Sequence, residues 1–99
     1  MEFLKDKIIQ VKHLCKQYHV ARLYVFGSIL TDKFNQNSDI DFLVDFDSVD
    51  LWEYADNYFD FKYSLQDLLQ KEIDLIESKA ITNPYLKKNI DNTKQLIYE

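Results

Sequence analysis

Apolar and polar residues follow two different periods along the chain. Between residues 3 and 19, apolar positions recur every three or four residues, as on one face of a helix. Residues 21–26 are a short run, rich in aromatic and β-branched side chains, that stops at Gly27. This run predicts a buried strand. The apolar positions of the helix are Leu4, Ile8, Val11, Cys15 and Tyr18.

Two further strands are predicted, separated from the first by a polar segment. Residues 29–38 are polar and rich in turn formers, with one helical turn expected at their start. Residues 39–46 alternate in their first half and predict a second strand, and residues 72–77 predict a third.

A long helix is predicted between the second and third strands, ending near Gln70. Asp50 and Glu53 have the spacing of a capping box at its start. Its buried side is expected to comprise Leu51, Tyr54, Ala55, Tyr58, Leu65, Leu68 and Leu69.

The C-terminal residues predict a last helix that begins with Asn83 and Pro84, since proline suits the first helical position. Leu86, Ile90 and Ile97 would form its buried side. The order of elements predicts an α+β fold of mixed α/β layers.

The length of 99 residues fits one compact domain, so we assign residues 1–99 to it. So short a chain buries little of its surface, and a homo-oligomer or a partner protein would supplement its stability. The net charge of −5 argues against independent nucleic-acid binding, which normally needs a basic stripe.

The single cysteine, Cys15, allows no internal disulfide, and we expect it to be a buried structural thiol. No apolar run has the length of a membrane span, and residues 1–7 do not have the pattern of a signal peptide. A cytoplasmic protein that does not enter the membrane is expected.

The only glycine follows the first strand directly, as Gly27-Ser28. Glycine lets the backbone take a conformation closed to other residues and lets a ligand approach the main chain. Backbone N–H groups at a strand end, with the Ser28 hydroxyl, suit a phosphate. An ordinary turn is the alternative, and this signal alone does not decide between them.

Two carboxylates open the second strand at Asp39 and Asp41. Alternate strand residues share a face, with Cα atoms about 6.5–7 Å apart, so both can converge on divalent ions. Magnesium prefers such oxygen ligands. Asp45 and Asp47 form a second Asp-x-Asp pair at the end of the predicted strand, where a turn begins. We interpret Asp47 as a turn residue and leave Asp45 open.

A third acid, Asp74, lies between Ile73 and Leu75 in the last predicted strand. A charge inside so apolar a strand is costly unless it is paired or bound to a metal. If the two strands are neighbours, Asp74 joins Asp39 and Asp41 around the same ions.

Gly27-Ser28, a ten-residue gap, Asp39 and Asp41, and the later Asp74 together resemble the signature of the DNA polymerase β-like nucleotidyltransferase superfamily. The resemblance covers nearly the whole chain. It is strongest to the minimal nucleotidyltransferases, many of which are antitoxins paired with HEPN-domain toxins. It implies that superfamily's fold, a small mixed sheet with helices packed on it.

The resemblance also implies an activity and a role for each residue. Gly27 and Ser28 would hold the β- and γ-phosphates of ATP. Asp39 and Asp41 would bind two Mg²⁺ ions, and Asp74 would complete the metal site and help to activate the attacking hydroxyl. The products would be pyrophosphate and an adenylylated hydroxyl, with a tyrosine of a HEPN toxin as the acceptor.

The chain departs from the family pattern after Ser28. Relatives commonly place an arginine and a glycine within the next few residues, whereas this chain has Ile29-Leu30-Thr31-Asp32. Lys33 is the nearest positive charge and is assigned as its substitute. The departure supports an alternative hypothesis, a protein that neutralises its partner by binding alone. An antibiotic-modifying enzyme is disfavoured because the chain has no substrate-binding domain.

Aromatic residues crowd the long helix, and they cannot all face inward. We therefore expect some of them to form an exposed patch of the kind that marks protein interfaces. These residues are Trp52, Tyr54, Tyr58, Phe59, Phe61 and Tyr63.

Overall fold

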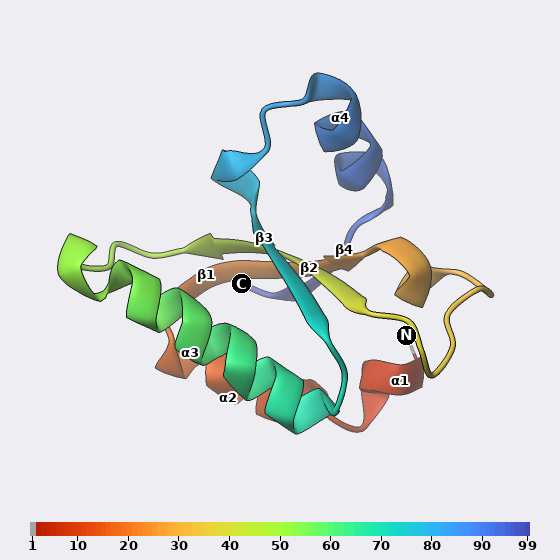
Figure 1. Ribbon diagram of the computed structural model, residues 1–99, viewed down its shortest axis with the longest axis horizontal. Helices are drawn as coiled ribbons and strands as arrows, with labels where there is room; N and C mark the ends of the chain where they lie inside the picture. Colours follow the sequence, from red (N-terminus) through yellow and green to blue (C-terminus); the bar gives the residue numbers. More distant parts are fainter. Residues whose placement is uncertain (1) are drawn as a thin grey trace.

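Four strands form one mixed sheet in the order β3-β2-β1-β4 in the computed structural model, which describes residues 2–99 (Figure 1). The strands are β1 (Val20–Phe26), β2 (Ile40–Phe46), β3 (Ile73–Glu77) and β4 (Gln95–Tyr98). β1 is antiparallel to both β2 and β4, whereas β2 and β3 are parallel. The three predicted strands are therefore present within one residue of their expected bounds, and β4 is an addition.

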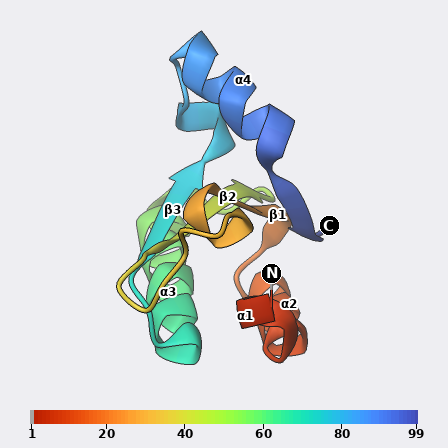
Figure 2. The same cartoon turned by 90° about the vertical axis from the view of Figure 1, so that its right-hand side faces the viewer.

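One face of this sheet is covered by helices. α2 (Ile8–Gln17) and α3 (Leu51–Leu69) lie side by side on it, and α4 (Pro84–Thr93) lies on the opposite side of the sheet (Figures 1 and 2). The core forms between the sheet and the two helices, where β2 contributes alternate residues that are fully buried. Its central members are Ile40, Phe42 and Val44 from β2, Val11 and Cys15 from α2, and Phe61, Leu65 and Leu69 from α3.

The N-terminal helix is interrupted, contrary to the prediction of one helix over residues 3–19. α1 (Glu2–Lys5) ends where the Lys7 N–H donates to the Leu4 carbonyl at 2.9 Å, and α2 restarts at Ile8. A bond to the third residue back closes a turn and does not continue an α-helix. Leu4 is nevertheless fully buried, so it still belongs to the predicted apolar face although the helix is interrupted.

α3 begins and ends close to the predicted residues. The Asp50 carboxylate accepts from the Trp52 N–H at 3.2 Å, and Gln70 ends the helix in the left-handed conformation at φ 53°. Leu51 and Ala55 were expected on its buried side but are exposed. The reason is that the start of α3 extends past the ends of the strands (Figure 1). Trp52, Phe59 and Tyr63 are also exposed, as the crowding of aromatic residues predicts.

The C-terminal prediction was wrong in part. α4 ends at Thr93, and the following residues form β4 against the open edge of β1. Ile97 is buried as expected, but in a strand, and Leu86 is 46% exposed. Unpaired backbone groups of β1 explain the strand, because a neighbouring strand satisfies them.

None of the helices described over residues 2–99 combines the length and apolar composition that crossing a membrane requires.

Candidate active site

Gly27 brings the end of β1 into contact with Asp41. Its φ is +80°, a left-handed conformation that favours glycine. A Cβ atom added here would overlap the Asp41 Oδ2 atom. Phe26 and Asp41 are also partners in the β1–β2 register. The sequence places glycine at this position because both the backbone angle and the space require it.

Asp41 and Asp74 are direct neighbours on the parallel strands β2 and β3. Register partners on adjacent strands lie about 4.8 Å apart and point to the same face. Ile40 and Phe42 on either side of Asp41 are buried toward the helices, so Asp41 points to the opposite face. Asp39 is exposed and lies immediately before β2.

The Asp41 carboxylate lies within the electrostatic influence of the other two. The pKa of Asp41 is raised from its ordinary value, first by burial and then by the negative charges of Asp74 and Asp39. Among residues 2–99, no lysine, arginine or histidine forms an ion pair with any of the three. No ion pair within the described residues therefore offsets the negative charge of this cluster.

The three carboxylates are the type of ligand that a divalent cation prefers, although their side chains are not close enough together to hold one. Within the part of the chain that the structure describes, no three acidic, histidine or cysteine side chains are arranged closely enough to hold a metal. Carboxylate oxygens are nevertheless the ligands that Mg²⁺ prefers. Asp39 and Asp74 are exposed, so rotation of their side chains toward Asp41 is open to both. The pKa shift of Asp41 shows that both are within electrostatic reach.

Ser28 lies in a 3₁₀ turn, Gly27–Leu30, that continues β1. Its carbonyl accepts from the Thr31 N–H at 2.9 Å and from the Thr31 hydroxyl at 2.8 Å, which fixes the turn. Lys33 lies farther along, in an exposed turn. The structure thus brings Gly27 and Ser28 to the aspartate cluster, whereas Lys33 makes no ion pair within residues 2–99.

A pocket of about 580 Å³ opens between the Gly27 turn and α4. Apolar side chains alternate in its lining with side chains that carry an amide or a hydroxyl. Sequence reasoning missed the contribution of α4, because only the fold brings this helix to Gly27. The lining residues are Phe26, Gly27, Leu30, Thr31, Leu86, Asn89, Ile90, Thr93 and Gln95.

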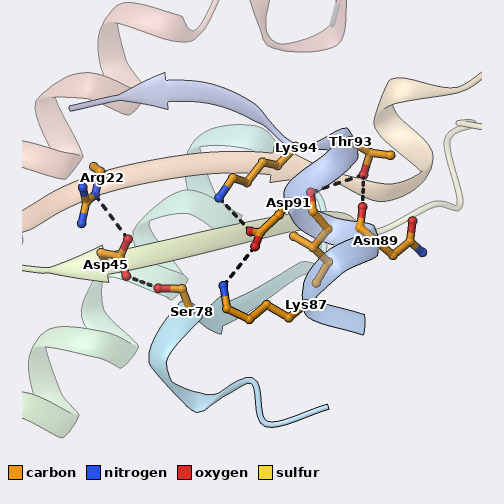
Figure 3. A network of polar contacts seen from close by, with 9 residues as sticks. Arg22, Asp45, Ser78, Lys87, Asn89, Asp91, Thr93 and Lys94 are labelled. Atoms are coloured by element: carbon orange, nitrogen blue, oxygen red, sulfur yellow. Dashed lines mark hydrogen bonds and ion pairs between the residues drawn. The ribbon is translucent and has the colours of Figure 1, made fainter. Parts of the chain in front are cut away.

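Asp45 belongs to a separate network on the sheet (Figure 3). Its carboxylate lies 3.4 Å from the Arg22 guanidinium and accepts a hydrogen bond from the Ser78 hydroxyl. Both contacts satisfy the charge locally, so Asp45 is a structural residue. On α4, Asp91 pairs with Lys87 at 3.0 Å and with Lys94 at 2.9 Å.

The sequence matches the family model described as polymerase β nucleotidyltransferase over residues 9–99. Two relatives from Methanocaldococcus jannaschii are provisionally named protein adenylyltransferases. One is 37% identical over 96% of this chain and 93% of its own length. The other is 36% identical over 96% of this chain and 93% of its own length.

Solved structures share the fold. One described provisionally as a minimal nucleotidyltransferase has a TM-score of 0.78 at 24% identity, over 95% of this chain and 92% of the other. A Shewanella oneidensis complex of a tri-AMPylated HEPN toxin with its MNT antitoxin has a TM-score of 0.64 at 17% identity, over 94% and 70%. A toxin–antitoxin structure with AMP-PNP has a TM-score of 0.70 at 19% identity, over 92% of this chain and 72% of the other.

These similarities extend over nearly the whole chain, and they agree with the Gly-Ser turn and the aspartates that the sheet brings together. The chain belongs to the polymerase β-like nucleotidyltransferase family.

Proposed function

We propose that this protein transfers AMP from ATP, with Mg²⁺, to a hydroxyl group on a HEPN-domain toxin and thereby acts as its antitoxin in the cytoplasm. The observation that carries the proposal is the contact of Gly27 with Asp41, together with the register pairing of Asp41 and Asp74. A backbone turn able to receive phosphate therefore lies directly beside carboxylates that attract a divalent cation.

The pocket beside Gly27 gives the nucleotide a place. The triphosphate would lie along Gly27 and Ser28, where backbone N–H groups at the end of β1 and the Ser28 hydroxyl suit a phosphate. The base and ribose would enter the pocket toward α4, between Leu30 and Ile90. Apolar side chains suit the faces of a base, and the amides of Asn89 and Gln95 suit its polar edge.

Each aspartate would have a role in the reaction. Asp39, Asp41 and Asp74 would hold Mg²⁺, which supplies charge stabilisation at the phosphates when bound. The acceptor oxygen attacks the α-phosphorus, the bond from that phosphorus to the bridging oxygen breaks, and pyrophosphate leaves. Asp74 receives the proton of the attacking hydroxyl. Holding both reactants in line supplies much of the rate enhancement.

The toxin partner is inferred from named relatives. Two relatives bear the name protein adenylyltransferase, and one complex of the same fold holds an AMPylated HEPN toxin with its antitoxin. The exposed aromatic side chains of α3 offer a surface for such a partner.

One observation favours a second function, neutralisation by binding alone. The segment after Ser28 carries Asp32 and no arginine, and Lys33 lies in an exposed turn. A triphosphate at Gly27 would then lack the cation that relatives commonly supply from this segment.

The two functions differ in a labelling assay. The protein is incubated with Mg²⁺, ATP labelled at the α-phosphate and a HEPN toxin encoded by a neighbouring gene. We expect label on the toxin with the wild type, none with Asp39→Asn or Asp41→Asn, and full labelling with Asp47→Asn. Asp47 is a matched control because it belongs to the other Asp-x-Asp pair and is exposed. A silenced but unlabelled toxin would instead establish neutralisation by binding.

A further inference from the structure

Lys71 holds the loop that leads into Asp39. Its ammonium group donates to three backbone carbonyls of this loop, those of Asn35 at 3.0 Å, Gln36 at 3.0 Å and Ser38 at 2.8 Å. An ammonium group has three N–H donors, and all three are used here. Lys71 itself lies in the short connection between α3 and β3.

The loop is shaped to receive this cation. The Asn37 N–H donates to the Asn35 side chain at 2.8 Å, and the Asn35 N–H donates to the Ser38 hydroxyl at 3.1 Å. These two bonds curl the loop, so that its carbonyls converge on one point. The Phe34 and Phe3 rings lie 4.8 and 5.6 Å from the ammonium nitrogen, and their faces attract a cation.

No acid takes part in holding this charge. Among residues 2–99, Lys71 forms no ion pair with an aspartate or glutamate. The partners that the ammonium group contacts are carbonyl dipoles and aromatic faces, and three converging carbonyls require a compact cation with several donors. Neither a methionine nor a planar guanidinium satisfies three carbonyls that meet at one point.

The two peptide groups that flank Asp39 are both held from the α3–β3 connection. On one side, the Ser38 carbonyl accepts from Lys71 at 2.8 Å. On the other, the Ile40 N–H donates to the Glu72 carbonyl at 3.1 Å. Asp74 follows two residues after Glu72 and lies in β3. One short stretch of chain therefore fixes the backbone of Asp39 relative to Asp74.

We propose that Lys71 is a positioning residue for the metal site, holding Asp39 where its carboxylate can join Asp41 and Asp74 around a divalent cation. This inference rests on the proposed function, because it deepens the role of the same aspartates. Lys71 does not touch the reacting atoms. Its effect passes through the carbonyls of the loop, as residues behind a metal ligand commonly act.

The test measures Mn²⁺ binding, by the loss of the electron paramagnetic resonance signal of the free ion. We expect Lys71→Met to raise the Kd for Mn²⁺ by about tenfold, within the range for residues that orient metal ligands. Lys12→Met is the matched control, because Lys12 is exposed on α2 on the helical side of the sheet, and its Kd should equal that of the wild type. Saturating Mn²⁺ should restore AMP transfer by Lys71→Met.

The outcomes separate this inference from the proposed function. An unchanged Kd in folded Lys71→Met overturns the role of Lys71. If that variant does not fold, Lys71→Arg replaces it, with a severalfold rise expected and an unchanged Kd again overturning the role. A wild type that binds Mn²⁺ but transfers no AMP overturns the proposed function and leaves the comparison of Kd values valid. A wild type that binds no Mn²⁺ overturns the metal site and the role of Lys71 together.

Discussion

Replacing Asp41 with asparagine removes one negative charge from the aspartate cluster and preserves the shape of the side chain. The structure places this carboxylate half-buried, beside Asp74 in register and close to Asp39, with no ion pair from residues 2–99 to offset it. We therefore expect Asp41→Asn to make the metal-free protein more stable at pH 7, although the same change should abolish metal-dependent transfer.

The magnitude follows from Coulomb's law. Two unit charges about 5 Å apart repel by about 0.8 kcal/mol in water and by about 3 kcal/mol at an effective dielectric constant of 20. Asp74 is exposed, so solvent screens the pair and the lower end applies. A gain of about 1 kcal/mol corresponds to a rise in Tm of roughly 4–8 °C for a domain of this size.

The gain should depend on pH with a definite sign. Because the folded-state pKa of Asp41 is raised, the folded protein holds its proton more tightly than the unfolded chain does. Ionisation of Asp41 therefore lowers the stability of the wild type as the pH rises through the folded-state pKa. The difference between Asp41→Asn and the wild type should grow as the pH rises through the folded-state pKa and shrink as the pH falls toward the ordinary pKa of an aspartate, about 4.

Thermal unfolding followed by circular dichroism, with EDTA present, measures the effect. Asp60→Asn on the exposed side of α3 is the control and should leave Tm unchanged. Mg²⁺ should then reverse the order of stability, since a ligand at 100 times its Kd stabilises the folded state by about 2.7 kcal/mol. A lower Tm for Asp41→Asn in EDTA, or an equal one, would refute the idea that the carboxylates repel one another.

Two further predictions concern residues with strong steric or electrostatic constraints. Gly27→Ala should lower the free energy of unfolding by about 1–3 kcal/mol and abolish AMP transfer, because the left-handed backbone disfavours alanine and the added Cβ displaces the Asp41 carboxylate. Denaturant titration measures the stability and the labelling assay measures the transfer, and full activity of the variant would contradict the contact between Gly27 and Asp41. Cys15 should resist iodoacetamide at pH 8 until the protein is unfolded, because burial raises the pKa of its thiol to about 12. Mass spectrometry measures the labelling, and a labelled Cys15 in the native protein would contradict the burial of this thiol.

The strands that carry the site were predictable because each has a local signal. Asp41 and Asp74 are polar interruptions in otherwise apolar strands, and Gly27 is the only glycine of the chain. Their pairing across β2 and β3 is not local, since it depends on a parallel register that the sequence pattern does not specify. The sequence therefore predicts which aspartates are candidate site residues, and the strand pairing of the sheet determines which of them become neighbours.

The C-terminal residues show where such prediction fails. The same apolar spacing at Leu86, Ile90 and Ile97 fits a helix throughout, but the chain turns at Lys94 and Ile97 becomes part of β4. The open edge of β1 decides this outcome, and it becomes visible only after the other strands are assembled. For the same reason, neither the pocket wall formed by α4 nor the three bonds made by Lys71 had a local signal.

The place of β3 at the edge of the sheet bears on the size of molecule that can serve as acceptor. Asp41 lies on an inner strand and is half-buried, whereas Asp74 lies on the outermost strand and is exposed. Under the proposed function, the nucleotide would approach from the Gly27 side and the acceptor from the outer edge of the sheet, where no further strand bounds the approach within residues 2–99. A hydroxyl on the surface of a folded protein can reach such an edge without being enclosed.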